Sequence, residues 1–152
     1  MINIEVVSDN NLWNKKIEKD LFFKKLLKFF PKKYRFIKKK VTLTILLSDN
    51  KNIKKLNKKF RNKNKSTDIL SFPFNSKIRI SKESYIGDII ISYNFINKPR
   101  PLSYKIFKER LIKTFIHGFL HLLHYDHIKI KDYKKMIKKE LKIYNSVYKK
   151  ID

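Results

Sequence analysis

The chain contains no cysteine, and only two glycines and four prolines occur among its 152 residues. Without cysteine, it can form no disulfide and cannot build the thiolate ligand sets that are typical of structural zinc sites. Because glycine and proline are so scarce, no stretch resembles a flexible linker or a domain boundary. We therefore expect residues 1–152 to fold as a single domain, which is long enough to bury a hydrophobic core.

Long apolar segments are also missing from the sequence. No apolar run approaches the roughly 18 residues that suggest a membrane span. The first residues, Met1 to Val7, lack the basic start and the apolar stretch of a signal peptide. The absence of cysteine is compatible with a reducing compartment. These features predict a cytoplasmic protein that does not associate with membranes.

Acidic residues are few, and this imbalance gives the chain a large positive charge. It has 38 Lys and Arg against 13 Asp and Glu, for a formal net charge of +25. Basic side chains neutralise phosphates, so the charge favours a nucleic acid partner. However, only five of these residues are Arg, and the chain is also rich in Asn, Ile and Phe. Drift towards A/T-rich codons would produce the same bias, so the charge favours nucleic acid only modestly.

The hydrophobic periodicity predicts alternating strands and helices. We expect strands at 2–7, 41–47, 68–74 and 86–92, and loops at 75–85 and 97–102. We expect one helix over 11–30, ended by Pro31, and another that Ser48 or Asp49 caps. Two more helices follow, one capped by Ser103 and one over about 132–148. This order indicates an α/β fold with a small mixed sheet of about four strands, flanked by helices.

All four histidines fall between residues 117 and 127, in the spacing His117-x3-His121-x5-His127. His117 and His121 share one face of the predicted helix, and the chain then turns so that His127 can reach the same ion. Three imidazole ligands leave a fourth position of zinc open, so we predict one hydrolytic Zn²⁺ site per chain. His124 is either a fourth ligand, a group that supports a ligand, or a replacement residue, and we favour the last.

The residue after the first histidine separates two kinds of hydrolase. The histidine spacing equals that of the metzincin proteases, which need a Glu at this position as general base. Here the position is Gly118, which cannot transfer a proton. Peptide hydrolysis is therefore disfavoured, although zinc alone still lowers the pKa of its bound water to about 7.

Two further segments carry polar residues of interest. Arg61 stands in a lysine-dominated chain, so its planar, bidentate guanidinium points either to phosphate binding or to a structural salt bridge. Asp68 caps a turn or orients a site residue. Gly87 and Asp88 precede an apolar run, which an ordinary turn at the entrance of a strand explains.

These segments together resemble one family. The pattern His-Gly-x-Leu-His-Leu-x-x-Tyr-Asp-His over 117–127 is similar to the signature of the bacterial YbeY endoribonucleases, also called rRNA maturation factors. Residues 57–61, 67–73 and 87–92 match the family's other blocks in the same order. The resemblance covers roughly residues 40 to 141.

The resemblance implies a zinc-dependent, single-strand-specific endoribonuclease in ribosome biogenesis. Its tasks would be the maturation of the 16S rRNA 3′ end and ribosome quality control, with RNA and the ribosome as partners. The family's zinc ligands fall on His117, His121 and His127, and its arginine falls on Arg61. The family fold is α/β, a small mixed sheet flanked by helices, with the metal in a basic groove. The sequence departs from the family at His124, where glycine is usual, so we expect a left-handed backbone there.

Two alternatives remain open at this point. One is a metzincin-like peptide hydrolase, which Gly118 disfavours. The other is a non-catalytic ribosome-binding protein with structural zinc, which a fourth protein ligand such as His124 would favour.

Overall fold

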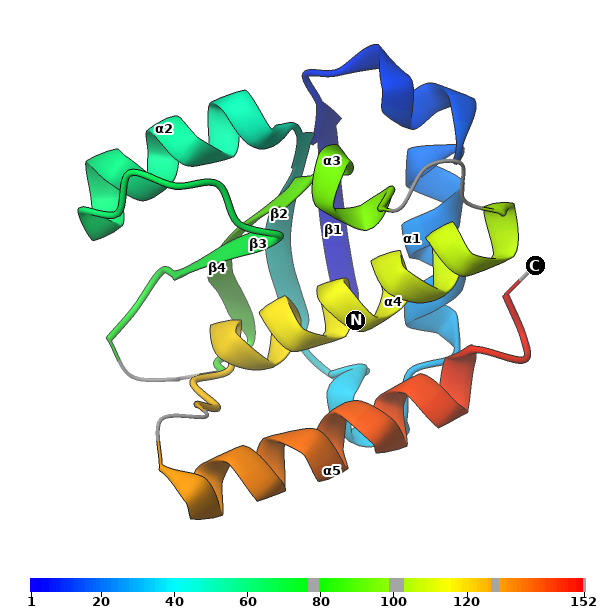
Figure 1. Cartoon of the computed structure of the whole chain (residues 1–152). Helices are drawn as coiled ribbons and strands as arrows, with labels where there is room; N and C mark the ends of the chain where they lie inside the picture. The colour runs from blue at the N-terminus through cyan, green and yellow to red at the C-terminus, as the bar shows by residue number, and fades with distance from the viewer. Residues whose placement is uncertain (77–79, 99–102, 127–128, 152) are drawn as a thin grey trace.

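The computed structural model describes residues 1–76, 80–98, 103–126 and 129–151. Its centre is a four-stranded sheet of β1 (Ile2–Ser8), β2 (Lys40–Ser48), β3 (Ile69–Pro73) and β4 (Glu83–Ser92), in the order β1-β2-β4-β3 (Figure 1). β1 and β4 run parallel to β2, whereas the edge strand β3 is antiparallel to β4. The predicted small mixed sheet is confirmed.

Helices cover both faces of this sheet. They are α1 (Lys19–Lys28), α2 (Asn50–Arg61), the short α3 (Tyr93–Ile96), α4 (Tyr104–Leu122) and α5 (Ile130–Val147). α4 packs against β3 and β4, α5 packs on α4, and α2 covers the opposite face (Figure 1). The α/β class is therefore confirmed, with the histidine-bearing helix on one side of the sheet. In the described residues, no helix is long and apolar enough to cross a membrane.

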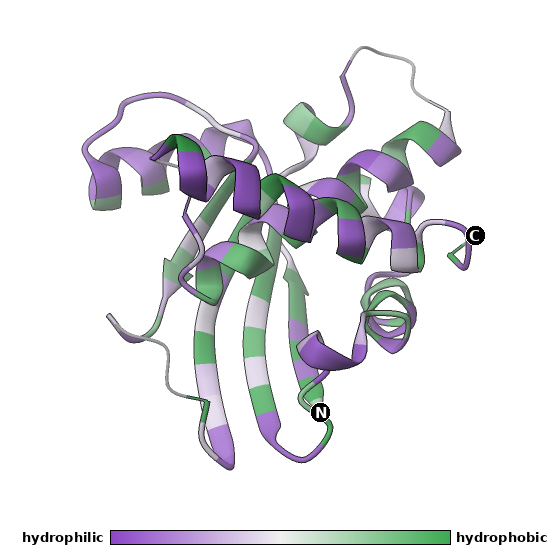
Figure 2. Ribbon diagram, turned by 90° about the horizontal axis from the view of Figure 1, so that it is seen from below, coloured by the Kyte–Doolittle hydropathy of each residue, from purple (hydrophilic) through white to green (hydrophobic). Residues whose placement is uncertain are grey.

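The main core lies between the sheet and the helices α1, α4 and α5. Alternate residues of β2 point into it with no solvent exposure, and Figure 2 shows this alternation as bands of hydropathy along the strands. α4 contributes an apolar stripe whose members are all buried: Phe107, Leu111, Phe115, Phe119 and Leu122. Phe115 meets Phe23 of α1 edge to face, with ring centroids 5.3 Å apart. This packing fixes the position of α4 above the sheet.

The single helix expected over 11–30 is wrong. The structure has a 3-10 helix, η1 (Asn11–Lys15), followed by α1, and each begins at its own cap, Asn10 and Glu18. Trp13 lies fully buried in η1, and its indole N–H donates to the carbonyl of Ser48 at 2.9 Å. This hydrogen bond to a distant strand interrupts the helix, although the apolar spacing in the sequence continues across the interruption.

Three other regions differ from or complete the predicted elements. β4 begins at Glu83, inside the segment expected to be a loop, while residues 99–102 of the second predicted loop lie outside the described part. A second 3-10 helix, η2 (Lys32–Tyr34), was not predicted. Asp49 and Ser103 cap α2 and α4 through their side chains, as expected.

Gly87 and Asp88 do not form a turn, because they lie within β4. The pairing of β2 with β4 shifts there, since Thr42 pairs with Tyr85 but Leu43 pairs with Gly87. Gly87 has a φ of +140°, and a Cβ at this position would lie 2.2 Å from the carbonyl oxygen of Phe72. The glycine therefore permits a β-bulge and the close approach of β3.

Candidate metal centre

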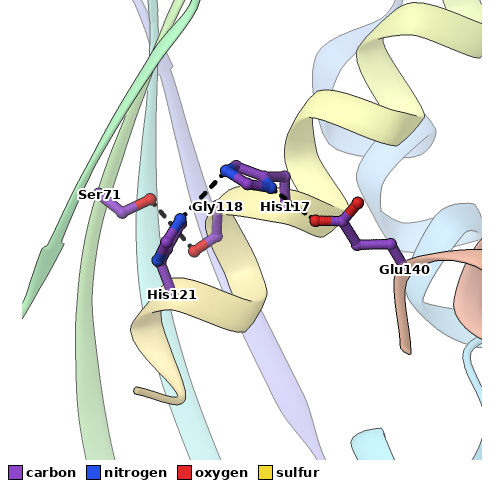
Figure 3. A network of polar contacts seen from close by, with 5 residues as sticks. All are labelled: Ser71, His117, Gly118, His121 and Glu140. Carbon is purple, nitrogen blue, oxygen red and sulfur yellow. Dashed lines mark hydrogen bonds and ion pairs between the residues drawn. The ribbon is translucent and has the colours of Figure 1, made fainter. Parts of the chain in front are cut away.

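Two imidazoles face each other on α4. His117 and His121 lie one helical turn apart, and their Nε2 atoms are 3.0 Å apart (Figure 3). Two nitrogens bound to one tetrahedral zinc at 2.0–2.1 Å would be about 3.3 Å apart. The pair therefore fits two ligands of one metal ion with little rearrangement.

His127, the third predicted ligand, lies outside the described residues, so its role stays a prediction. Within the described stretches, no three His, Cys, Asp or Glu side chains form a group that could hold a metal ion. His124 is therefore not a third member of the histidine pair in the structure. This arrangement is compatible with the interpretation that His124 is a replacement residue and not a ligand.

The chain turns sharply after α4, as His127 would need. The amide of Tyr125 donates to the carbonyl of Leu120 at 3.0 Å, and the amide of His124 donates to that of His121 at 2.9 Å. These bonds form a Schellman motif, in which the residue after the helix adopts a left-handed conformation. His124 occupies this position with a φ of 65°, so the left-handed backbone expected at the departure from the family is confirmed.

Glu140 is a member of the site that the sequence did not suggest. It lies on α5, and its Oε1 is 2.6 Å from Nδ1 of His117, on the side of the ring away from His121 (Figure 3). Both side chains are about one-third exposed. Because 23 residues separate Glu140 from His117, no local motif links them.

Gly118 lets α4 lie close to the edge strand. A Cβ at this position would be 2.4 Å from Cδ1 of Ile69 and 3.0 Å from Oγ of Ser71. The Ser71 hydroxyl donates to the Gly118 carbonyl at 3.1 Å (Figure 3). The position that carries the catalytic Glu in metzincins therefore has no carboxylate, and a side chain there would require Ile69 to shift.

Arg61, at the end of α2, is tied to the same edge strand. Its Nη2 donates to the carbonyl of Ser71 at 2.6 Å, and its guanidinium carbon lies 5.4 Å from the centre of the Phe72 ring. No salt bridge to Arg61 occurs among the described residues, which leaves the structural salt bridge without support there. Ser71 thus links the arginine, through its carbonyl, to the histidine helix, through its hydroxyl.

One cavity of about 680 Å³ brings the predicted residues together. Arg61, His117, His121 and His124 all line it, although they come from α2, from α4 and from the turn after α4. Its wall also contains two basic residues, Lys63 and Lys65, and two acidic residues, Asp68 and Asp126. The motifs at 57–61 and 67–73 and the histidine segment over 117–126 therefore meet at one site, whereas Gly87 and Asp88 support the strand beside it.

Two asparagines fix the basic loop after α2, one with a buried side chain and one with a left-handed backbone. Asn57 is 2% exposed, and its Nδ2 donates to the carbonyl of Lys65 at 2.9 Å. Asn62 ends α2 with a φ of 55°. On the next strand, the Asp68 carboxylate accepts from the amide of Ile69 at 2.8 Å, so it caps the entrance of β3. These contacts hold the lysines at the rim of the cavity.

The fold and the cavity define a class: a small α/β protein that presents a histidine pair, an arginine and a lysine-bearing loop around one opening. Comparison with known proteins identifies the family. The family model described as Endoribonuclease YbeY matches residues 4–148, and the chain belongs to this family.

Curated relatives match over nearly the whole chain. Endoribonuclease YbeY of Pelagibacter ubique (strain HTCC1062) is 62% identical over 152 residues, which covers 99% of both chains. Endoribonuclease YbeY of Buchnera aphidicola subsp. Acyrthosiphon pisum (strain APS) is 41% identical over 151 residues, or 99% of this chain and 93% of the relative. The solution structure of a Thermotoga maritima protein aligns with a TM-score of 0.63 and 25% identity, over 97% of this chain and 90% of that one.

Proposed function

We propose that this protein is a zinc-dependent endoribonuclease that cleaves single-stranded RNA. We further propose that it acts in the cytoplasm on ribosomal RNA, in 16S rRNA 3′-end maturation and ribosome quality control. The observation that carries the proposal is the histidine pair, whose Nε2 atoms lie 3.0 Å apart in a cavity shared with Arg61. The full-length relatives named endoribonuclease support the reaction class.

The proposed zinc ligands are His117, His121 and His127. When bound, zinc supplies a Lewis acid that polarises a phosphate oxygen or activates water. The protein's own contribution is to hold neutral imidazoles in place, because α4 is packed on the sheet through its buried aromatic stripe. The left-handed backbone at His124 turns the chain directly after α4, as a third ligand further along the chain would require.

The proposed role of Arg61 is to bind the reacting phosphate. Its hydrogen bond to Ser71 uses one terminal nitrogen, and the guanidinium has five N–H donors in all. The remaining donors can bind two phosphate oxygens side by side and offset the negative charge that grows in the transition state. The Phe72 ring beneath it limits its rotamers, so less entropy is lost on binding.

The proposed role of Lys63 and Lys65 is to bind the neighbouring phosphates. They lie on the loop that Asn57 holds at the rim of the cavity. A flexible single strand can follow this rim and direct one phosphate towards the histidines, whereas a stacked duplex is too rigid to do so. The proposed preference for single strands follows from this difference in flexibility.

The two alternatives are not favoured. A peptide hydrolase of the metzincin type would need a base after His117, where Gly118 is packed against Ile69. A structural zinc site would need a fourth protein ligand, and His124 does not join the histidine pair among the described residues.

An end-labelled RNA hairpin with a single-stranded tail tests the proposal. We expect the protein to cut the tail, spare the stem and leave casein intact, and we expect a chelator to stop cleavage until zinc is restored. His117→Ala should abolish cleavage, while His124→Ala, which changes a histidine of the same cavity, should retain it. Cleavage by the chelator-treated protein, or equal cutting of stem and tail, would contradict the proposal.

A further inference from the structure

A hydrogen bond between Glu140 and His117 joins α5 to α4. Nδ1 of His117 lies 2.6 Å from Oε1 of Glu140, and Nε2 of the same ring lies 3.0 Å from Nε2 of His121. The two ring nitrogens of His117 therefore have separate tasks, and Figure 3 shows the carboxylate and His121 on opposite sides of the ring.

The position of the proton on the imidazole ring determines what this contact does to His117. A neutral imidazole carries one N–H, and a carboxylate oxygen can only accept a hydrogen bond. The proton must therefore lie on Nδ1 of His117, which leaves the lone pair of Nε2 directed at His121. A carboxylate bonded to Nδ1 also fixes the orientation of the ring and makes Nε2 a stronger ligand.

We propose that Glu140 is a positioning residue for the metal centre, which sets the tautomer, orientation and basicity of His117. This inference rests on the zinc site of the proposed function, and it adds a role for α5. That helix follows the predicted ligand His127 in the chain and returns to the first ligand through Glu140. The last part of the domain thus takes part in metal binding without supplying a ligand.

Packing holds the carboxylate in place. Met136, Ile143 and Val147 of α5 are buried, with exposures of 2%, 0% and 0%. Glu140 lies between Met136 and Ile143 on the buried side of the helix. The nearby Lys113 has its ammonium group 4.8 Å from the centre of the Tyr144 ring, and the described residues show no salt bridge from it to Glu140. The contact that the described structure gives the Glu140 carboxylate is therefore with Nδ1 of His117.

Zinc affinity is the first measurement, made by competition with a chromogenic chelator. We expect Glu140→Ala to weaken zinc binding by about 10- to 100-fold, as for other carboxylates that orient a metal-bound histidine. Glu140→Gln should lose less, since its amide oxygen still accepts from Nδ1 but carries no charge. Glu109→Gln is the matched control. It makes the same charge change on α4, about two helical turns before His117, and its zinc affinity should stay within about twofold of wild type.

The tautomer of His117 is the second measurement, made by ¹⁵N NMR of the imidazoles in the metal-free protein. We expect Nδ1–H in wild type and Glu140→Gln, and a shift towards Nε2–H in Glu140→Ala. A residue that only packs the helices would not change this signal. If Glu140→Ala does not fold without metal, the isosteric Glu140→Gln decides the outcome by its zinc affinity.

Wild-type affinity in both Glu140 variants, or a loss no larger than in Glu109→Gln, would overturn the positioning role. That result would leave the zinc site intact if His117→Ala still loses the metal. Failure of the wild-type protein to bind zinc would instead refute the zinc site itself, so the two failures are distinguishable.

Discussion

Gly118→Glu introduces the residue that a metzincin protease would need, and we expect it to destabilise the fold without creating a protease. The new Cβ would lie 2.4 Å from Cδ1 of Ile69 and 3.0 Å from Oγ of Ser71. Replacing glycine in a helix gains up to about 1 kcal/mol, but overpacking costs about 1–3 kcal/mol. Gly118→Ala, which tests the Cβ alone, should therefore lose about 0–2 kcal/mol.

The glutamate adds a carboxylate between α4 and β3, and burying an unpaired charge costs several kcal/mol. We expect Gly118→Glu to lose about 3–6 kcal/mol, and each kcal/mol lowers the melting temperature of a domain of this size by about 2–4 °C. The assay is thermal and guanidinium unfolding in the presence of chelator, so that bound metal does not contribute. Unchanged stability of Gly118→Glu would refute the close packing of α4 on β3. Zinc-dependent cleavage of casein by this variant would support the peptide hydrolase alternative.

Four other substitutions test separate parts of the structure. Arg61→Lys keeps the charge but loses the bidentate geometry, so single-turnover RNA cleavage should fall by about 10²-fold while equilibrium binding changes little; an unchanged rate would exclude the transition-state role. His124→Gly should raise the free energy of unfolding by about 1 kcal/mol, because a left-handed backbone is costly for histidine, and zinc loss in this variant would make His124 a ligand. Gly87→Ala should cost about 2–5 kcal/mol in guanidinium unfolding, and a loss below about 1 kcal/mol would contradict the bulge geometry. The Asn52 amide holds the pKa of Asp49 below its ordinary value of 3.8, so Asp49→Ala should lose about 1 kcal/mol at neutral pH, and this difference from wild type should shrink as the pH falls below 3.8; a constant difference would exclude the charged cap.

The sheet and most helices could be predicted because their signals are local. Alternating apolar residues mark β2, and the stripe along α4 marks its buried face. The long helix over 11–30 failed because apolar spacing does not record where a helix is interrupted. Trp13 is held by the Ser48 carbonyl, and Asn10 and Glu18 cap two separate helices there.

The site was predicted only where its signals in the sequence are local. The histidine spacing placed His117 and His121 on one helical face, and the retained arginine drew attention to Arg61. Glu140 and Ser71 act through contacts that span 23 and 47 residues, so only the packing of α5 and β3 against α4 reveals them. Gly87 seemed to mark a turn because a β-bulge and a turn both select a glycine.

The most direct test of the zinc-dependent endoribonuclease is a titration of metal-free protein with zinc, with cleavage of single-stranded RNA followed at each step. We expect cleavage to rise linearly and to stop rising at one zinc per chain, while His121→Ala shows no rise at the same additions. Full cleavage before any zinc is added, or an equal rise in His121→Ala, would contradict the assignment of this histidine pair as the catalytic metal centre.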